Sequence, residues 1–301
     1  MAEQRLVHLK NDFIEVGILP ECGASIAYFR TNGKKLFDVM RSASQTSITK
    51  KDALGMSMFP MIPYSFQIKN GEFTYWGIKR IVPKNHSSFA NPLHGDGWCS
   101  KWNIVEEKQD SLRLSLTHNK EKDKGYPFSY EALITYTLKE KTLQIEMSLT
   151  NRALMPMPCG FGLHPYFNKT PHVTLAFNTK NVCYHENDPI DRPYKTPKEW
   201  SFDTPKQLKE MVFDTCFNGF DGKAKITWPK YGIGLSINCG ESFSHIALYS
   251  PYHKNFFCLE PSTMAPDAFN IASKGIIGSG IQSIGKDETL TGCISFTVEG
   301  I

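Results

Sequence analysis

The amino-acid sequence predicts an all-β protein built from antiparallel sheet. Several segments alternate apolar and polar residues with a period of two, short turn signals separate these segments, and helical signals are few. A period of two places one set of side chains on a buried face and the other set toward solvent. Alternating strands joined by short turns are typical of sheets stacked as a sandwich or closed as a barrel.

The alternation is clearest in four segments, each short enough to form one strand. They are residues 111–116, 143–149, 233–237 and 294–298. Turn-forming residues, usually a polar or aromatic residue followed by glycine, lie between such segments. They fall at positions 31–33, 69–71, 221–222 and 231–232. We interpret Asp221 and Gly222 as a hairpin turn.

The clearest helical signal lies in residues 204–211. Thr204 is a suitable N-cap, Pro205 suits the first helical position, and Lys-Gln-Leu-Lys-Glu follows. We therefore expect one short helix in this segment. No glycine- or serine-rich linker divides the chain, and the βαβ alternation of a dinucleotide-binding fold is missing. These features predict a single domain over residues 1–301.

The composition narrows the classes of partner and compartment. The 34 basic and 30 acidic residues give a net charge of +4 without a basic stripe, so we expect no nucleic-acid partner. The 8 cysteines form no CxxC pair, which favours free thiols in a reducing compartment. The first residues lack an apolar leader, and no apolar run is long enough to cross a bilayer. We expect a cytoplasmic monomer or homodimer with no membrane partner.

Two histidines lie in segments that favour a functional role. His94 belongs to residues 91–98, NPLHGDGW, a turn-rich loop of the kind that often carries functional side chains. His164 belongs to residues 160–168, GFGLHPYFN, where the following proline restricts its backbone and aromatic residues can shield the imidazole. The alternatives are a polar surface position for His94 and a structural, packed position for His164.

Two acidic residues complete the set of candidates. Glu260 directly follows the apolar segment 256–259, so its carboxylate should sit at the end of a strand, in solvent or facing a cleft. Asp214 lies in residues 213–222, FDTCFNGFDG, and is suited either to holding a ligand hydroxyl or to capping a turn.

Two histidines and a carboxylate are compatible with two kinds of chemistry. A glutamate base and an imidazole acid could move protons on opposite sides of a substrate, since their ordinary pKa values of about 4.3 and about 6.5 suit this division near neutrality. The same three residues could instead bind a metal as two histidines and one carboxylate. The absence of any close HxH or HxxxH pair weakens the metal hypothesis.

Taken in order, these motifs resemble the aldose 1-epimerase family, also called galactose mutarotases. The segment 58–65, MFPMIPYS, adds to the resemblance, which extends over most of the chain. It implies a large antiparallel β-sandwich of the galactose mutarotase-like type with few short helices. It also implies an isomerase that interconverts the anomers of a small-molecule sugar and needs no metal or other cofactor.

The resemblance also implies roles for individual residues. Glu260 matches the general base, His164 the general acid and His94 the second histidine, near the sugar ring oxygen. Asp214 matches an acidic residue that binds sugar hydroxyls. Aromatic residues could stack on the sugar ring, and the candidates are Tyr64, Trp98 and Tyr166.

One departure from the family pattern concerns the grip on the sugar. The family commonly has Asn-Arg after the Pro-Tyr-Ser segment, whereas this chain has Phe66 and Gln67. Gln67 can still hydrogen-bond a sugar but carries no charge. The alternatives are therefore a non-catalytic carbohydrate-binding or sensor protein and a hexose-phosphate epimerase. The latter needs a basic pocket, for which the candidates by charge are Lys79, Arg80 and Lys84.

Overall fold

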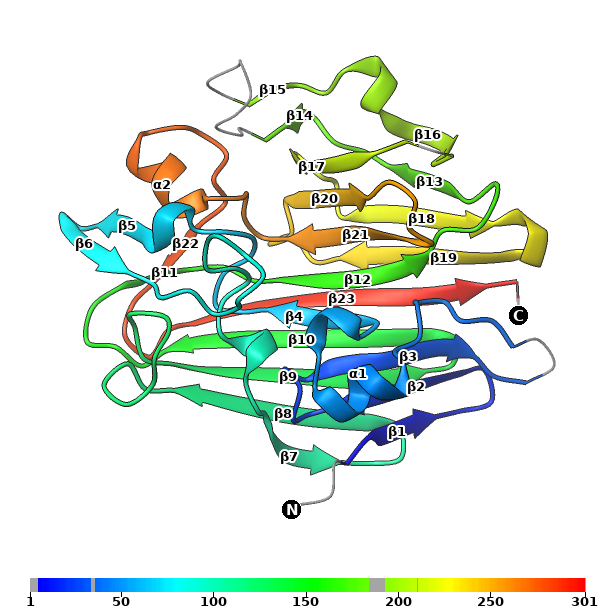
Figure 1. The fold of residues 1–301 in the computed structure, drawn as a ribbon, viewed down its shortest axis with the longest axis horizontal. Helices are drawn as coiled ribbons and strands as arrows, with labels where there is room; N and C mark the ends of the chain where they lie inside the picture. Colours follow the sequence, from blue (N-terminus) through cyan, green and yellow to red (C-terminus); the bar gives the residue numbers. More distant parts are fainter. Residues whose placement is uncertain (1–4, 34–35, 184–192, 210, 301) are drawn as a thin grey trace.

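Two large antiparallel sheets make up most of the chain, as Figure 1 shows. The structure is a computed structural model that describes residues 5–33, 36–183, 193–209 and 211–300. Helices in this part of the chain are few and short. The predicted all-β fold class is confirmed.

The first sheet has ten strands in the order β1-β2-β3-β4-β12-β21-β20-β17-β14-β15. Their bounds are Val7–Lys10 (β1), Ile14–Leu19 (β2), Ser25–Thr31 (β3), Met58–Met61 (β4), Gly162–Asn168 (β12), Phe256–Ser262 (β21), His245–Ser250 (β20), Phe213–Asn218 (β17), Asn181–Val182 (β14) and Tyr194–Lys195 (β15). The strands that carry His164 and Glu260, β12 and β21, are neighbours at the centre of this sheet.

The second sheet has nine strands in the order β16-β13-β18-β19-β23-β10-β9-β8-β7. Their bounds are Phe202–Gln207 (β16), Thr174–Phe177 (β13), Lys223–Trp228 (β18), Ile233–Cys239 (β19), Thr289–Glu299 (β23), Thr142–Asn151 (β10), Tyr130–Lys139 (β9), Ser111–His118 (β8) and Asn103–Glu107 (β7). All four segments with clear alternation are strands of this sheet, and in β8 buried leucines alternate with partly or fully exposed residues, as predicted.

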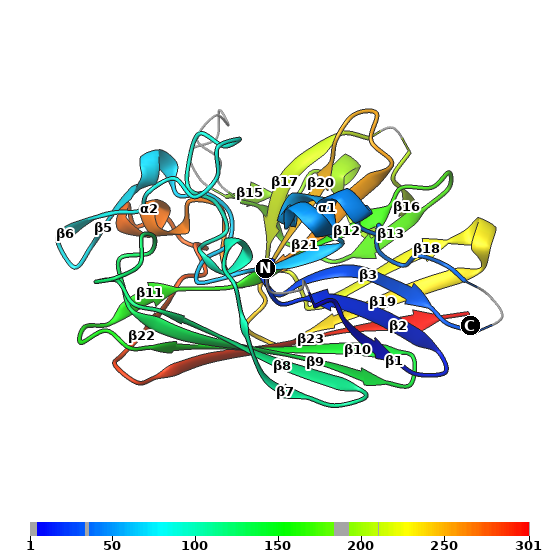
Figure 2. The same ribbon diagram turned by 60° about the horizontal axis from the view of Figure 1, so that its bottom comes forward.

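The two sheets pack face to face, and Figure 2 shows them as separate layers. Ile18 of the first sheet and Ile145 of the second are fully buried in the same hydrophobic core. The hydroxyl of Tyr136 on β9 crosses this core to donate a hydrogen bond to the backbone carbonyl of Ala24 (2.6 Å). Buried polar groups need such partners, so this contact fixes one layer against the other.

Short elements fill the connections between the large sheets. Two strand pairs stand apart, β5 (Glu72–Tyr75) with β6 (Ile78–Ile81) and β11 (Met157–Cys159) with β22 (Gln282–Ile284). The α-helices are α1 (Gln45–Lys50) and α2 (Ala268–Ser273), and the 3-10 helices are η1 (Ala53–Gly55), η2 (Lys69–Gly71), η3 (Gly97–Cys99), η4 (Lys198–Trp200) and η5 (Pro229–Tyr231). None of the helices in the described ranges has the length and apolar character needed to span a membrane.

The predicted helix over residues 204–211 is wrong, because residues 202–207 form the strand β16. This strand is at the edge of the nine-stranded sheet, where a proline without an N–H does not interrupt the ladder. Phe202 is buried and stacks on Phe177 of the neighbouring β13, with ring centroids 4.8 Å apart. Burial of this aromatic pair therefore outweighs the local helical signal around Pro205.

The predicted hairpin at Asp221 and Gly222 is also wrong. The strand before it, β17, belongs to the ten-stranded sheet, and the strand after it, β18, belongs to the nine-stranded sheet. The segment therefore carries the chain from one layer to the other. The glycine has a φ of 82°, and Asp221 accepts a hydrogen bond from the backbone N–H of Lys223 (3.0 Å). An Asp-Gly pair thus specifies the turn but not the strands that it joins.

Candidate active site

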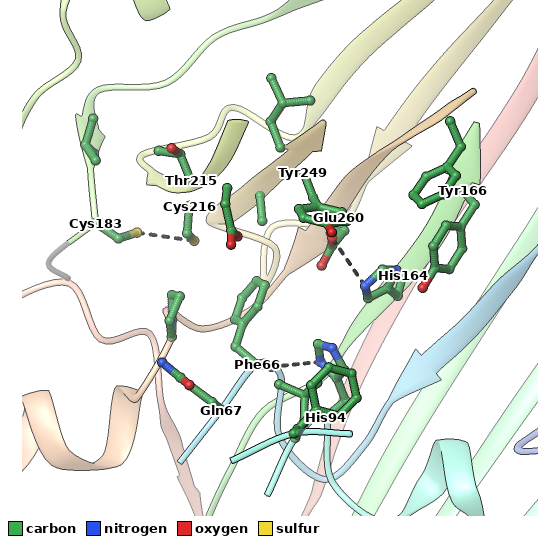
Figure 3. A pocket seen from close by; sticks show the side chains of 18 of the residues that line it. Phe66, Gln67, His94, His164, Tyr166, Cys183, Thr215, Cys216, Tyr249 and Glu260 are labelled. Atoms are coloured by element: carbon green, nitrogen blue, oxygen red, sulfur yellow. Dashed lines mark hydrogen bonds and ion pairs between the residues drawn. The ribbon is translucent and has the colours of Figure 1, made fainter. Parts of the chain in front are cut away.

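Two neighbouring strands bring His164 and Glu260 together. In the pairing of β12 with β21, Tyr166 lies opposite Cys258, so His164 and Glu260 also stand opposite each other. Nε2 of His164 lies 3.5 Å from Oε1 of Glu260 (Figure 3). The two groups are thus side by side on one face of the sheet, whereas the sequence led us to expect an acid and a base on opposite sides of a substrate.

His94 reaches the same place from the loop before η3. Its backbone has a φ of 59°, and its carbonyl accepts a hydrogen bond from the N–H of Ile62 (3.1 Å). Its Nδ1 accepts a hydrogen bond from the backbone N–H of Phe66 (3.1 Å), which assigns the proton of the neutral ring to Nε2. The ring meets that of His164 edge to face, with centroids 5.2 Å apart. His94 therefore offers an N–H donor beside the pair.

A cavity of about 940 Å³ opens over these three side chains. That volume is typical of small-molecule sites. The cavity wall includes six of the seven residues that the sequence assigns to the site, namely His94, His164, Glu260, Asp214, Gln67 and Tyr166. Residues far apart in the chain thus meet at one concave surface.

Trp98 does not line this cavity, and neither does the alternative aromatic candidate Tyr64. Trp98 is 1% exposed, stacks on Phe59 and donates a hydrogen bond from Nε1 to the carbonyl of Leu93 (2.9 Å). Tyr64 is fully buried and packs against Tyr126 in the core. Both assignments as sugar-stacking walls are wrong, since both aromatic side chains are buried in the interior and neither lines the cavity.

Burial changes the protonation of the central pair. It raises the pKa of Glu260 well above its usual value, and the nearby charge of Asp214 acts in the same direction. Burial lowers the pKa of His164 to about 3, with the charge of Arg41 adding to the effect. The expected supply of protonated His164 near neutrality is therefore wrong for the free site. Both shifts favour a protonated Glu260 beside a neutral His164 in the free site.

The second histidine is neutral as well. Burial lowers the pKa of His94 well below its usual value, and the neighbouring His164 lowers it further. A neutral imidazole with its proton on Nε2 can donate a hydrogen bond to an oxygen without giving up that proton. His94 is suited to polarising a substrate oxygen, whereas the pair of His164 and Glu260 is suited to moving a proton.

The cavity wall also contains residues that the sequence analysis missed. They are Arg41, Cys183, Cys216 and Tyr249, together with several apolar side chains. Tyr249 lies opposite both Cys258 and Asp214 in the sheet, so it joins the carboxylate end of the wall to the centre. No alternation in β20 marks Tyr249, because its residues are nearly all buried, and no local pattern marks Arg41.

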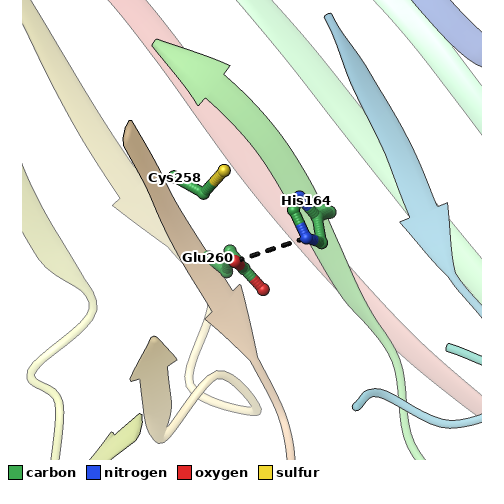
Figure 4. Close-up of side chains that lie close together, drawn as sticks. All are labelled: His164, Cys258 and Glu260. Carbon is green, nitrogen blue, oxygen red and sulfur yellow. Dashed lines mark ion pairs between the residues drawn. The ribbon is translucent and has the colours of Figure 1, made fainter. Parts of the chain in front are cut away.

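One cluster of side chains in the described ranges could hold a metal ion. The ligand atoms of His164, Cys258 and Glu260 all lie within 4.8 Å of one another (Figure 4). His94, which the metal hypothesis included, is not part of this cluster. Burial raises the pKa values of both Cys258 and Glu260, so a cation would have to displace protons from both groups to bind there.

The glycine after His94 fixes the loop, and we expect Gly95→Ala to be strongly destabilising. Gly95 has a φ of 72°, and a Cβ there would lie 2.1 Å from the backbone oxygen of Ile62. Gly77 has the same φ of 72° with nothing within 4 Å, so Gly77→Ala is a matched control for the backbone cost. That cost is about 1–2 kcal/mol. Urea unfolding should show a loss at least twice as large for Gly95→Ala, and equal losses would contradict the close approach.

Comparisons with known proteins agree with this architecture. A family model described as aldose 1-epimerase matches residues 5–284. The chain is similar to YphB of Escherichia coli K12, with 27% identity over 256 residues that cover 82% of this chain and 85% of that protein. A solved structure from Escherichia coli K12 has a TM-score of 0.87 at 23% identity and covers 99% of this chain and 100% of that one. A galactose mutarotase-like protein from Clostridium acetobutylicum has a TM-score of 0.83 at 17% identity, covering 100% and 96% of the two chains. The predicted galactose mutarotase-like sandwich is therefore confirmed.

Proposed function

Since the chain belongs to the aldose 1-epimerase family, we propose that it is a mutarotase that interconverts the α and β anomers of a hexose. The observation that carries this proposal is the side-by-side placement of His164 and Glu260, 3.5 Å apart at the floor of one cavity. In a cyclic hemiacetal the anomeric hydroxyl and the ring oxygen are bonded to the same carbon. Two adjacent proton-transfer groups match two such oxygens.

The proposed reaction moves one proton at each oxygen. The carboxylate of Glu260 accepts the proton of the anomeric hydroxyl, the carbonyl forms, and the bond from the anomeric carbon to the ring oxygen breaks. Protonated His164 donates its proton to the departing ring oxygen, and the N–H of His94 stabilises that oxygen. The free aldehyde rotates about the bond to the next carbon, and ring closure reverses both transfers. Gln67, Tyr166 and Asp214 would bind the rest of the sugar.

In the free site the proton that His164 must donate is favoured on Glu260 instead. Ring opening needs Glu260 ionised and His164 protonated, whereas the free pair is a protonated Glu260 beside a neutral His164. Both forms hold one proton, so a transfer within the pair interconverts them without exchange with solvent. Sugar hydroxyls that hydrogen-bond to the carboxylate would favour the ionised form when substrate binds.

An anomer-exchange assay tests the proposal. Freshly dissolved α and β forms of several hexoses are mixed with purified protein that has been treated with a chelator, and exchange is followed by polarimetry or NMR. We expect exchange of at least one sugar to exceed the buffer control. Saturable sugar binding by calorimetry without faster exchange would instead support the carbohydrate-binding alternative, which the uncharged Gln67 motivates. Exchange that returns only when metal is restored would support the metal hypothesis.

The pH dependence of exchange should reflect the shifted pKa values. In the one-proton state Glu260 and His164 share a single titratable proton. Because the pKa of His164 is lowered and that of Glu260 is raised, this state extends from a pH below the ordinary imidazole pKa up to the raised pKa of Glu260. We therefore expect kcat/KM, which reports the free protein, to stay constant through pH of about 6.5 and to fall only on the alkaline side, as Glu260 loses its proton. A fall in kcat/KM as the pH rises through about 6.5 would show that the pair loses its titratable proton near the ordinary imidazole pKa, and would contradict the expected stability of the protonated pair above that pH.

A further inference from the structure

Arg41 is the only lysine or arginine among the described residues that line the cavity. Its backbone N–H donates a hydrogen bond to the carbonyl of Tyr166 (2.8 Å), which places it beside β12. Its guanidinium lies over the Tyr166 ring, 4.0 Å from the centroid, and 4.8 Å from the centroid of Phe256. Two aromatic faces therefore hold the cation in place.

The guanidinium is only partly satisfied by the protein. Its Nη2 donates hydrogen bonds to the backbone carbonyls of Leu54 (2.8 Å) and Met56 (2.7 Å). Within the described ranges, Nε and Nη1 bond to no residue, and no carboxylate lies within ion-pair distance of Arg41. Asp52 contributes only a longer-range field. The fork of donors that remains is the geometry that binds carboxylate, sulfonate or phosphate groups.

The acidic groups of the cavity leave the end at Arg41 open to an anion. Asp214 lies three strands away from Tyr166, through the registers Tyr166 to Cys258, Cys258 to Tyr249, and Tyr249 to Asp214. At about 4.8 Å per strand this is about 14 Å. Glu260 is closer, and burial raises its pKa, which favours its neutral form in the free site. The cavity thus has a cation at one end and a carboxylate at the other.

The position of Arg41 relative to the reacting groups suggests which part of a sugar it would meet. The ring of Tyr166 stacks on that of His164, with centroids 4.7 Å apart, so the guanidinium, the phenol and the imidazole form one column. His164 is the proposed partner of the ring oxygen. In a hexopyranose the ring carbon that carries the exocyclic carbon is bonded to that oxygen. A substituent on the exocyclic carbon would extend along the column toward Arg41.

We propose that Arg41 is a specificity-determining residue that binds an acidic exocyclic group, so that the preferred substrate is an anionic hexose. This inference rests on the proposed mutarotase function. The lysine and arginine candidates suggested by the sequence do not supply such a site, because Lys79, Arg80 and Lys84 do not line the cavity. Arg41 instead places a cation in a site where the usual family arginine is replaced by Gln67.

The test compares anionic and neutral forms of the same hexose. Anomer exchange is measured for a hexose, its 6-phosphate and the matching hexuronic acid, with wild type, Arg41→Lys, Arg41→Met and the control Lys84→Met. Lys84 is exposed and outside the cavity, so its variant removes one charge without touching the site. We expect wild type to favour at least one anionic sugar. Loss of a charge-assisted hydrogen bond should reduce that preference by about 10- to 100-fold in Arg41→Met, and less in Arg41→Lys.

The outcomes separate this inference from the proposed function. Equal or faster exchange of the neutral hexose by wild type would overturn the inference and leave the mutarotase proposal standing. If no sugar exchanges faster than in buffer, the mutarotase proposal fails, and calorimetry with the same sugars decides the role of Arg41 by itself. Binding of an anionic sugar that is lost in Arg41→Met but kept in Lys84→Met supports it. Because Arg41 also donates hydrogen bonds to backbone carbonyls, thermal unfolding of each variant is recorded. If Arg41→Met does not fold, the inference is decided by whether wild type prefers an anionic sugar and whether sulfate suppresses that preference.

Discussion

Replacing Glu260 with glutamine is expected to lower kcat/KM for anomer exchange by about 10²–10⁴-fold, the usual contribution of a positioned proton-transfer group. Glutamine has nearly the same shape and can still hydrogen-bond to His164, but it cannot take the proton of the anomeric hydroxyl. Glu260 is almost completely buried at 4% exposure, and the pKa of its carboxyl group is raised mainly by that burial. A carboxyl group whose pKa is raised in the folded protein must take up a proton on folding near neutral pH. Glutamine is already neutral and avoids that cost, so we expect stability to be kept or increased.

A matched control is available on the other sheet. Glu146 is an exposed residue in the middle of β10, so Glu146→Gln makes the same chemical change away from the cavity. Exchange rates and thermal unfolding are measured for both variants and wild type. If Glu260→Gln keeps wild-type exchange, Glu260 is not the base, and the role assignment is contradicted even though the fold is intact.

The sequence predicts the sheets better than it predicts their connections. The alternation in β8, β10, β19 and β23 reflects burial on one face of a sheet, which is a property of each strand by itself. The segment around Pro205 and the turn at Asp221 are different, because their structures depend on partners elsewhere in the chain. An edge position makes Pro205 acceptable in a strand, and the stacking sheets decide which strands Asp221 joins.

In the site, too, the sequence predicts features that belong to one segment and misses those that depend on distant residues. His94, His164 and Glu260 stand in recognisable motifs, and the structure places all three at one cavity. Their ionisation could not be predicted, because it depends on burial by residues far away in sequence. Trp98 illustrates a related limit, since an aromatic residue next to a functional loop can face the cavity or the core. Arg41 had no local signal, because only the pairing of its segment with β12 brings it to the wall.

The second large effect is expected for His164→Ala, which should also lower kcat/KM by about 10²–10⁴-fold because the ring oxygen loses its proton donor. The side chain is packed between the rings of Phe59 (4.6 Å between centroids) and Tyr166 (4.7 Å), so its removal leaves an imidazole-sized space. Added imidazole should therefore restore part of the activity. No rescue, together with near wild-type exchange in the variant, would exclude His164 as the acid.

The double variant Glu260→Gln/His164→Ala distinguishes a coupled pair from two independent groups. If the residues acted independently, their losses would multiply, to about 10⁴–10⁸-fold. The two groups are 3.5 Å apart and share one proton, so removing either leaves the other without a partner for its transfer. We therefore expect the double variant to be only slightly slower than the slower single variant. Full multiplication of the two losses would show that the proton is not shared, and the carboxyl group and the imidazole would then act as separate catalysts.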